Sequence, residues 1–169
     1  TLFRSLVLFV MILRTVAMEF RSKEASPRWR SFWDTVFAVA STGLAFLLGV
    51  AFGDVLSGVP MDADGNMSVT LIGLLTPVPL LVGATTVAMF AMHGSLYLVQ
   101  KTEGDLQARI RRAVPRLIAA FFVLNTVVVV AMVLFRQQIT AIYVDDIWPV
   151  IFPAAALVAI LMAYRLMRQ

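Results

Sequence analysis

The feature that most constrains this chain is a series of long apolar runs separated by short charged segments. Leu2–Leu13 and Thr35–Phe52 are the first two runs, and the charged segment Arg14–Asp34 lies between them. A helix needs about 20 consecutive apolar residues to cross a bilayer. The chain is 60% hydrophobic and only 14% charged, whereas an average soluble domain is about 25% charged. Lipid is therefore the expected solvent for most of this chain.

The pattern predicts an all-α fold, a polytopic transmembrane helical bundle that forms one membrane domain over residues 1–169. The first run is shorter than a span and begins at Thr1 with no charged segment before it. We therefore expect about four full spans plus one partial N-terminal span, and an internal fragment of a larger protein. The expected helices are 1–18, 33–56, 77–100, 117–135 and 147–164.

The charged residues predict the topology of these spans. Segments 19–32 and 101–116 are basic, whereas segments 57–76 and 136–146 are acidic or nearly neutral. Basic loops remain on the cytoplasmic side of a membrane, so we expect the first pair to be cytoplasmic and the second pair periplasmic. This segregation also explains the pI of about 10.1, and we expect no binding to nucleic acid.

The motifs of soluble catalysis and of metal binding are missing from the sequence. The chain has no cysteine, which excludes disulfides and thiolate metal sites. Asp62, Asp64 and Gly65 follow the start of a calcium-loop pattern, but the glutamate that closes such a loop is missing. We predict no metal site, and no catalytic residue on this chain by itself.

Two small residues in the second helix are candidates for helix packing. Gly49 and Gly53 have the GxxxG spacing, which lets two helices approach closely in lipid. We interpret the motif as a packing surface, because it is common in apolar segments.

His93 is the only histidine in the chain, and it lies in the expected helix 77–100. In a membrane span a histidine can hold a haem or a metal, relay a proton, or form a hydrogen bond to a neighbouring helix. No second ligand is apparent in the sequence. A structural hydrogen bond is the preferred interpretation, and a minor role in a proton or quinone path stays open.

Arg14, Glu19 and Asp34 are the candidates for a polar cluster at the membrane edge. An ionisable group close to an apolar span is costly unless it is paired, and a nearby arginine keeps a carboxylate ionised. One hypothesis is that this cluster aligns water for proton uptake. The preferred alternative is a structural ion pair that fixes the turn between the first two helices.

The stretch Arg14–Asp34, which contains these three residues, resembles subunit II of the cytochrome bd-type quinol oxidases, including their cyanide-insensitive relatives. The block Gly49–Pro60 and the block Leu74–Arg109, with HGSLYLVQKTEGDL at its centre, are similar to this family as well. Thr15, Asp54 and Thr76 depart from the residues usual in the family. The matching positions of the first block are Arg14, Glu19, Phe20, Arg21, Lys23, Trp29, Arg30, Trp33 and Asp34.

The resemblance implies a heterodimeric complex of the bacterial inner membrane that oxidises quinol, reduces dioxygen to water and generates a proton gradient. It implies that this chain binds no cofactor alone, and that haem b and haem d belong to the partner, subunit I. His93 would then not be a haem ligand. Small single-helix subunits, quinone and the lipid bilayer are the further expected partners.

Two other classes of protein stay open on the sequence alone. In a transporter or channel subunit we would expect polar or broken helices that meet near the middle of the bilayer. Here few polar residues lie within the expected spans. A scaffold membrane protein without catalysis is the other alternative. Co-purification of haem with a partner would favour the oxidase over both.

Overall fold

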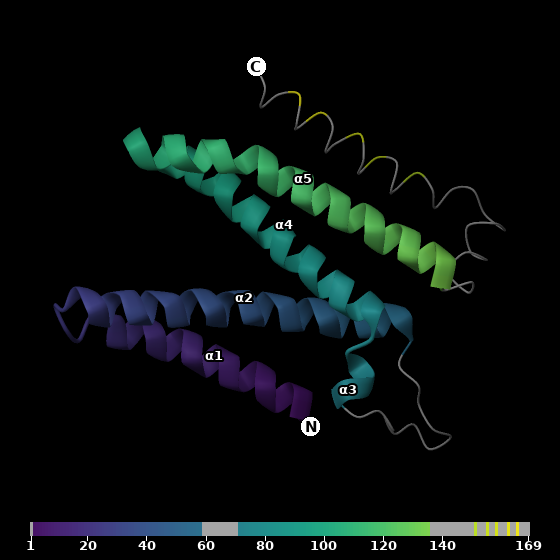
Figure 1. Ribbon diagram of the computed structural model, residues 1–169, viewed down its shortest axis with the longest axis horizontal. Helices are drawn as coiled ribbons and strands as arrows, with labels where there is room; N and C mark the ends of the chain where they lie inside the picture. The colour runs from purple at the N-terminus through teal and green to yellow at the C-terminus, as the bar shows by residue number, and fades with distance from the viewer. Residues whose placement is uncertain are drawn as a thin grey trace. The chain divides into compact units, whose positions relative to one another are not determined.

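The computed structural model describes residues 2–58 and 71–135, and five isolated helical residues beyond them: Ile151, Ala155, Val158, Met162 and Arg165. Throughout these residues the regular structure is α-helical, which confirms the expected all-α class (Figure 1). The elements are α1 (Leu2–Arg21), α2 (Pro27–Ser57), α3 (Leu71–Leu74), α4 (Pro77–Lys101) and α5 (Gly104–Phe135).

Three of the described helices are long and apolar enough to cross a membrane: Pro27–Ser57, Pro77–Lys101 and Gly104–Leu134. The N-terminal helix α1 is shorter, with 20 residues. The expected span 147–164 and the expected loop 136–146 lie outside the described residues, apart from the isolated positions named above. The chain is therefore a multi-pass membrane protein.

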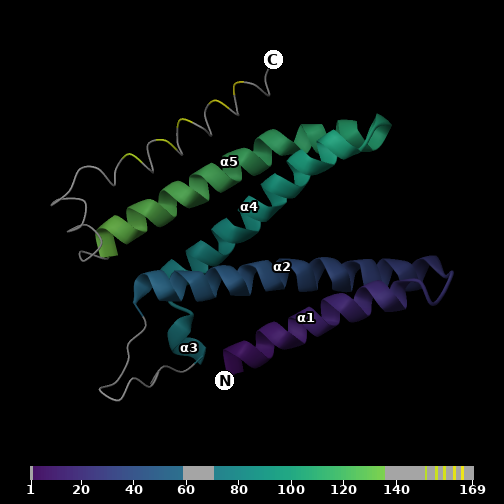
Figure 2. The same cartoon turned by 180° about the vertical axis from the view of Figure 1, so that it is seen from behind.

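The chain divides into two compact units, Thr1–Phe90 and Ala91–Gln169, and α4 runs through the boundary between them. In the first unit α1 lies alongside α2, as both views show, and α4 begins beside the far end of α2 (Figures 1 and 2). In the second unit the rest of α4 turns into α5 at Thr102 and Glu103.

The interior is built from small side chains, and the large apolar ones face outward. Ala17, Ala40 and Val50 are buried in the first unit, whereas Phe52 is 62% exposed on the same helix as Val50. This distribution suits lipid as the solvent. Burying an apolar side chain between helices gains little over leaving it in hydrocarbon, and close packing of small residues gains more.

Two helices begin earlier than the hydropathy pattern predicts. α2 begins at Pro27 and not at Trp33, because proline is well suited to the first position of a helix, where no N–H is needed. α5 begins at Gly104 and not at Leu117. Arginine is a good helix former, so the basic segment continues the helix beyond the apolar run. Hydropathy marks the edge of the membrane and not the end of the helix.

The turn between α4 and α5 is short and closed by side chains. Gly104 has a φ of 70°, a left-handed conformation that glycine adopts without strain. The hydroxyl of Thr102 donates to the Leu98 carbonyl at 2.7 Å, and Nε2 of Gln107 donates to the Val99 carbonyl at 2.9 Å. The Leu98 carbonyl also accepts from the Thr102 backbone N–H at 2.9 Å, whereas the Val99 carbonyl lies in the last turn of α4, where carbonyls lack intrahelical partners.

Candidate functional site

The turn between α1 and α2 is closed by hydrogen bonds to the last carbonyls of α1. The indole Nε1 of Trp29 donates to the Phe20 carbonyl at 2.8 Å, and the Lys23 N–H donates to the same oxygen at 3.1 Å. The Ser22 hydroxyl donates to the Glu19 carbonyl at 3.0 Å. Carbonyls at a helix C-terminus lack intrahelical partners. Trp29 on α2 therefore supplies a hydrogen-bond donor to the end of α1.

Aromatic rings fill the angle between the two helices. The ring of Trp33 on α2 lies 5.3 Å from the ring of Phe20 on α1, measured between centroids. Trp29 and Phe32 contact Trp33 edge-on at 5.7 and 5.3 Å, an arrangement that aromatic rings prefer over face-to-face stacking. The Trp33 indole N–H is buried and has no hydrogen-bond partner among the described residues. Trp33 therefore acts here through its apolar surface.

Two ion pairs lie at this turn. Nε of Arg21 donates to Oδ1 of Asp34, and a terminal nitrogen of the same guanidinium lies 3.4 Å from Oδ2. Nζ of Lys23 lies 2.9 Å from Oε1 of Glu19, one helical turn away in sequence. Both side chains of the first pair are about half exposed, at 52% and 53%. Both pairs therefore lie at the surface of the turn.

These contacts shift the ionisation of two groups. The hydrogen bond from Lys23, and then its positive charge, lower the pKa of the Glu19 carboxyl below its ordinary value. The hydrogen bond to Asp34, and then its negative charge, raise the pKa of Arg21 further above neutrality. Glu19 and Arg21 are therefore both charged at neutral pH.

The structure gives Arg14, Glu19 and Asp34 three different partners. The guanidinium carbon of Arg14 lies 5.5 Å from the centre of the Phe37 ring, a cation–π distance. Glu19 pairs with Lys23 and Asp34 with Arg21. No contact among the three residues themselves is found in the described part of the chain, so they do not form one polar cluster there.

The sequence indicates these three residues but not their partners. The Glu19–Lys23 pair has the i, i+4 spacing that favours ion pairs on a helix, and this signal could have identified it. The Arg21–Asp34 pair joins residues on two helices, and no spacing rule indicates it.

Gly49 and Gly53 lie where α2 crosses the first half of α4. Both glycines are buried. A Cβ atom on Gly49 would lie 2.8 Å from the Cα of Gly83 and 2.5 Å from Oγ1 of Thr86. A Cβ atom on Gly53 would lie 2.6 Å from the Cα of Pro79. Real Cβ atoms do not approach backbone so closely, so the crossing requires the absence of side chains.

The contact is reciprocal, because α4 also contributes a glycine. A Cβ atom on Gly83 would meet Cγ2 of Val50 at 2.8 Å and Cε2 of Phe46 at 2.9 Å. Val50 is completely buried. The sequence motif identified one helix of this pair, whereas Gly83, Thr86 and Pro79 were not recognised as its counterpart.

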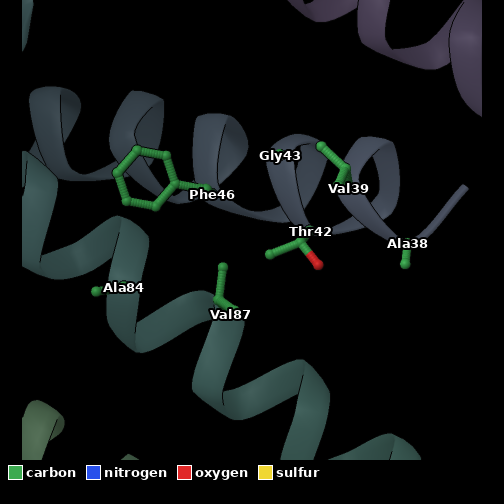
Figure 3. Close-up of a pocket in the computed structure, with 7 residues that line it drawn as sticks. All are labelled: Ala38, Val39, Thr42, Gly43, Phe46, Ala84 and Val87. Atoms are coloured by element: carbon green, nitrogen blue, oxygen red, sulfur yellow. The ribbon is translucent and has the colours of Figure 1, made fainter. Parts of the chain in front are cut away.

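Next to this crossing is an open apolar groove of about 650 Å³ between α2 and α4. Figure 3 shows Phe46 and Val87 projecting from the two helices toward the same hollow, with the hydroxyl of Thr42 at its side. Backbone and small side chains form the rest of the wall. The lining residues are Ala38, Val39, Thr42, Gly43, Phe46, Ala84 and Val87.

Comparison with known proteins identifies the family. The model of the family described as cytochrome bd terminal oxidase subunit II matches residues 2–169. The chain belongs to the cytochrome bd terminal oxidase subunit II family. It is 37% identical over 110 residues to the cytochrome bd-I ubiquinol oxidase subunit 2 of Escherichia coli (strain K12), which covers 63% of this chain and 29% of that relative.

Relatives from two other bacteria are similar to this chain as well. The chain is 33% identical over 118 residues to the cytochrome bd ubiquinol oxidase subunit 2 of Bacillus subtilis (strain 168), which covers 70% of this chain and 35% of that protein. A probable cytochrome oxidase subunit 2 of Haemophilus influenzae is 38% identical over 110 residues. The chain thus spans about a third of the length of these curated relatives.

A cytochrome bd oxidase contains haem, and the described residues of this subunit II chain can be tested for a haem site. His93 is exposed on α4 and has no hydrogen-bond partner among the described residues. Within residues 2–58 and 71–135, no group of three or more His, Cys, Asp or Glu side chains comes together. The described residues therefore give no observation that supports a haem site on this chain.

Proposed function

We propose that this chain is part of the non-haem subunit II of a membrane quinol:dioxygen oxidoreductase of the cytochrome bd type. The observation that carries the proposal is the family match over residues 2–169. It is supported by the names of the relatives, which are ubiquinol oxidase subunits. Three span-capable helices among the described residues, together with small-residue packing, fit a subunit that is embedded in a larger membrane complex.

In this proposal the redox chemistry belongs to the complex and not to this chain alone. Two quinols would release four electrons and four protons, and one dioxygen would take up the same number to form two waters. Haem b and haem d in subunit I supply the electron transfer to dioxygen. Subunit II contributes helices that pack against subunit I, and small single-helix subunits are further partners.

For the α1–α2 turn we propose a structural role. Arg21 joins α2 through Asp34, Trp29 caps α1, and Trp33 packs on Phe20. These contacts all cross between the two helices, so together they fix the angle of the turn. The competing role, proton uptake through Glu19 and Asp34, has no support from a shared cluster with Arg14.

The test of this role is Glu19→Gln in the full-length complex. We expect assembly and the rate of quinol-dependent oxygen consumption to remain close to those of the wild type. The matched control is Lys23→Gln, which removes the partner of Glu19 and leaves the carboxyl. A severalfold lower rate with Glu19→Gln alone, in a complex that assembles normally, would favour proton uptake over the structural role.

We also propose that the α1–α2 turn and the basic start of α5 face the cytoplasm of a bacterial inner membrane. Support comes from the basic residues concentrated in both segments, since such segments resist translocation. A single cysteine at Glu24 should react with a membrane-impermeant thiol reagent in inverted vesicles and not in right-side-out ones. The reverse pattern would contradict the orientation.

The experiment that tests the proposed function is a reduced-minus-oxidised optical spectrum of the tagged full-length complex from its native membrane. Bands of b-type and d-type haem, together with quinol oxidase activity, are the expected result. An intact complex without these haems would overturn the proposal and would favour a transporter or channel subunit instead.

A further inference from the structure

Arginines on one face of α5 form a cationic surface, and in the described part of the chain no carboxylate neutralises it. Arg109, Arg112 and Arg116 are spaced i, i+3 and i+7, which places them on one face of the helix. All three are exposed. We call these three residues the arginine stripe. Asp105 precedes Arg109 by one turn on the same face, but the ion pairs found among the described residues do not include it.

The α1–α2 turn, by contrast, pairs two of its basic residues with carboxylates. Arg21 pairs with Asp34, Lys23 with Glu19, and Arg14 lies over Phe37. In the arginine stripe the one described bond is from Nε of Arg112 to the Ala108 carbonyl at 3.2 Å. That bond leaves the two terminal nitrogens of Arg112 free to meet a ligand.

The length of α5 determines where the stripe lies relative to a membrane. The helix has 32 residues, which at 1.5 Å each rise about 48 Å. A hydrocarbon core is about 30 Å thick. The apolar part of the helix, 117–135, rises about 28 Å and fills that core. The preceding turns, which carry the stripe, must then extend through the headgroup region.

The stripe spans the headgroup layer and has the chemistry to bind it. Arg109 and Arg116 lie about 10 Å apart along the helix axis, which is more than the roughly 5–8 Å of polar layer on one side of a bilayer. A guanidinium is planar and binds phosphate oxygens through two parallel hydrogen bonds. Like charges one turn apart repel each other, and an anion between them removes that repulsion.

We propose that the arginine stripe of α5 is a binding site for the phosphate headgroups of anionic phospholipids. The lipid, held beside the span, neutralises the guanidinium groups and anchors α5 at a fixed depth. The site is distinct from any quinol chemistry, and the proposal stands whether or not the complex oxidises quinol. An acidic loop of a partner protein is the competing occupant, and the test below separates the two.

The test uses the full-length protein with its partner subunits, first equilibrated with mixed vesicles of phosphatidylglycerol and phosphatidylcholine. After detergent exchange, the retained lipids are quantified by mass spectrometry. We expect the wild type to retain phosphatidylglycerol in preference to phosphatidylcholine. The preference should fall about fivefold with Arg112→Gln, the change expected from one arginine at an anionic surface.

The matched control is Arg111→Gln, because Arg111 is equally exposed and adjacent in sequence but lies off the face of the stripe. We expect this variant to retain the wild-type preference. Arg112→Lys, which keeps the charge but not the planar fork, should lie between the two. Equal losses for Arg111→Gln and Arg112→Gln would overturn the proposal, because they would indicate general charge and not a site.

Salt dependence in the wild-type complex tests the site without any variant. In the wild-type complex alone, raising the salt concentration should release phosphatidylglycerol before phosphatidylcholine, because salt screens exposed charges. Retention of the two lipids in equal amounts at low salt would overturn the proposal. Loss of the partner subunits with Arg112→Gln at unchanged lipid preference would also overturn it, in favour of an acidic protein partner.

Discussion

The two ends of α2 are held to their neighbours in opposite ways. At the N-terminal end, α2 meets α1 through an exposed ion pair, an indole hydrogen bond and a set of aromatic rings. Near the C-terminal end, α2 crosses α4 where Gly49 and Gly53 leave no side chain between the backbones. Interactions between side chains hold the first contact, whereas the absence of side chains lets the two backbones approach in the second.

This difference predicts different tolerance to substitution. An exposed ion pair is weakened by water and salt, and its loss leaves nothing buried. At the glycine crossing an added methyl group meets backbone atoms, which cannot move aside as the end of a flexible side chain can. We therefore expect the crossing to be the more sensitive end, although it contains no charge and no hydrogen bond between side chains.

The largest effect is expected from Gly53→Ala at the crossing. The new Cβ atom would lie 2.6 Å from the Cα of Pro79, and overpacking of this kind costs about 1–3 kcal/mol. Thermal denaturation of the full-length complex measures it. The control is Gly94→Ala on α4, where a Cβ atom meets nothing within 4 Å. Equal stability of the two variants would contradict the proposed close contact.

A smaller effect is expected from Trp33→Ala at the other end of α2. Trp33 is half-buried, and its one ring contact that joins the two helices, with Phe20, contributes about 0.5–1.5 kcal/mol beyond burial. The loss should lower the midpoint of thermal denaturation without changing the α2–α4 crossing. Phe52→Ala is the matched control, since Phe52 is 62% exposed. A larger loss of stability from Phe52→Ala than from Trp33→Ala would contradict the packing role of Trp33.

The ion pair between Arg21 and Asp34 should contribute less than the aromatic contact. A double-mutant cycle with Arg21→Gln and Asp34→Asn, followed by thermal denaturation, isolates its coupling energy. We expect a small stabilising coupling that decreases as the salt concentration rises. A coupling as large as the effect of Gly53→Ala, and independent of salt, would mean that this pair is buried in the assembled complex.

The smallest effect is expected from the pH dependence of the Glu19–Lys23 pair. The pKa of Glu19 is lowered in the folded chain from its ordinary value of about 4.5, so the folded state favours the ionised carboxyl. Its contribution to stability is fully present above the ordinary pKa and is lost as the pH falls through the lowered one. Lys23→Gln should reduce the acid sensitivity of the denaturation midpoint below pH 5, and an unchanged profile would contradict the pairing.

Much of the candidate site could be located from the sequence, but its pairing could not. The charge pattern between two apolar runs identified the stretch Arg14–Asp34, and spacing identified Gly49 and Gly53. Arg21 binds Asp34 only because the turn folds α2 back on α1. Gly83 faces Phe46 and Val50 only because α4 crosses α2 at that level. Such contacts join residues far apart in the chain, and no local spacing encodes them.

The sequence by itself determined the helical class, the membrane as solvent and the family, because apolar length and motif residues are properties of the chain in order. Only the tertiary structure decided that the basic segment 104–116 is helix and not loop, and that Arg14, Glu19 and Asp34 have separate partners. The physical reason is that hydropathy reports the transfer of residues into lipid. Side-chain partners are set by the distance and direction between helices, which emerge only when the chain has folded.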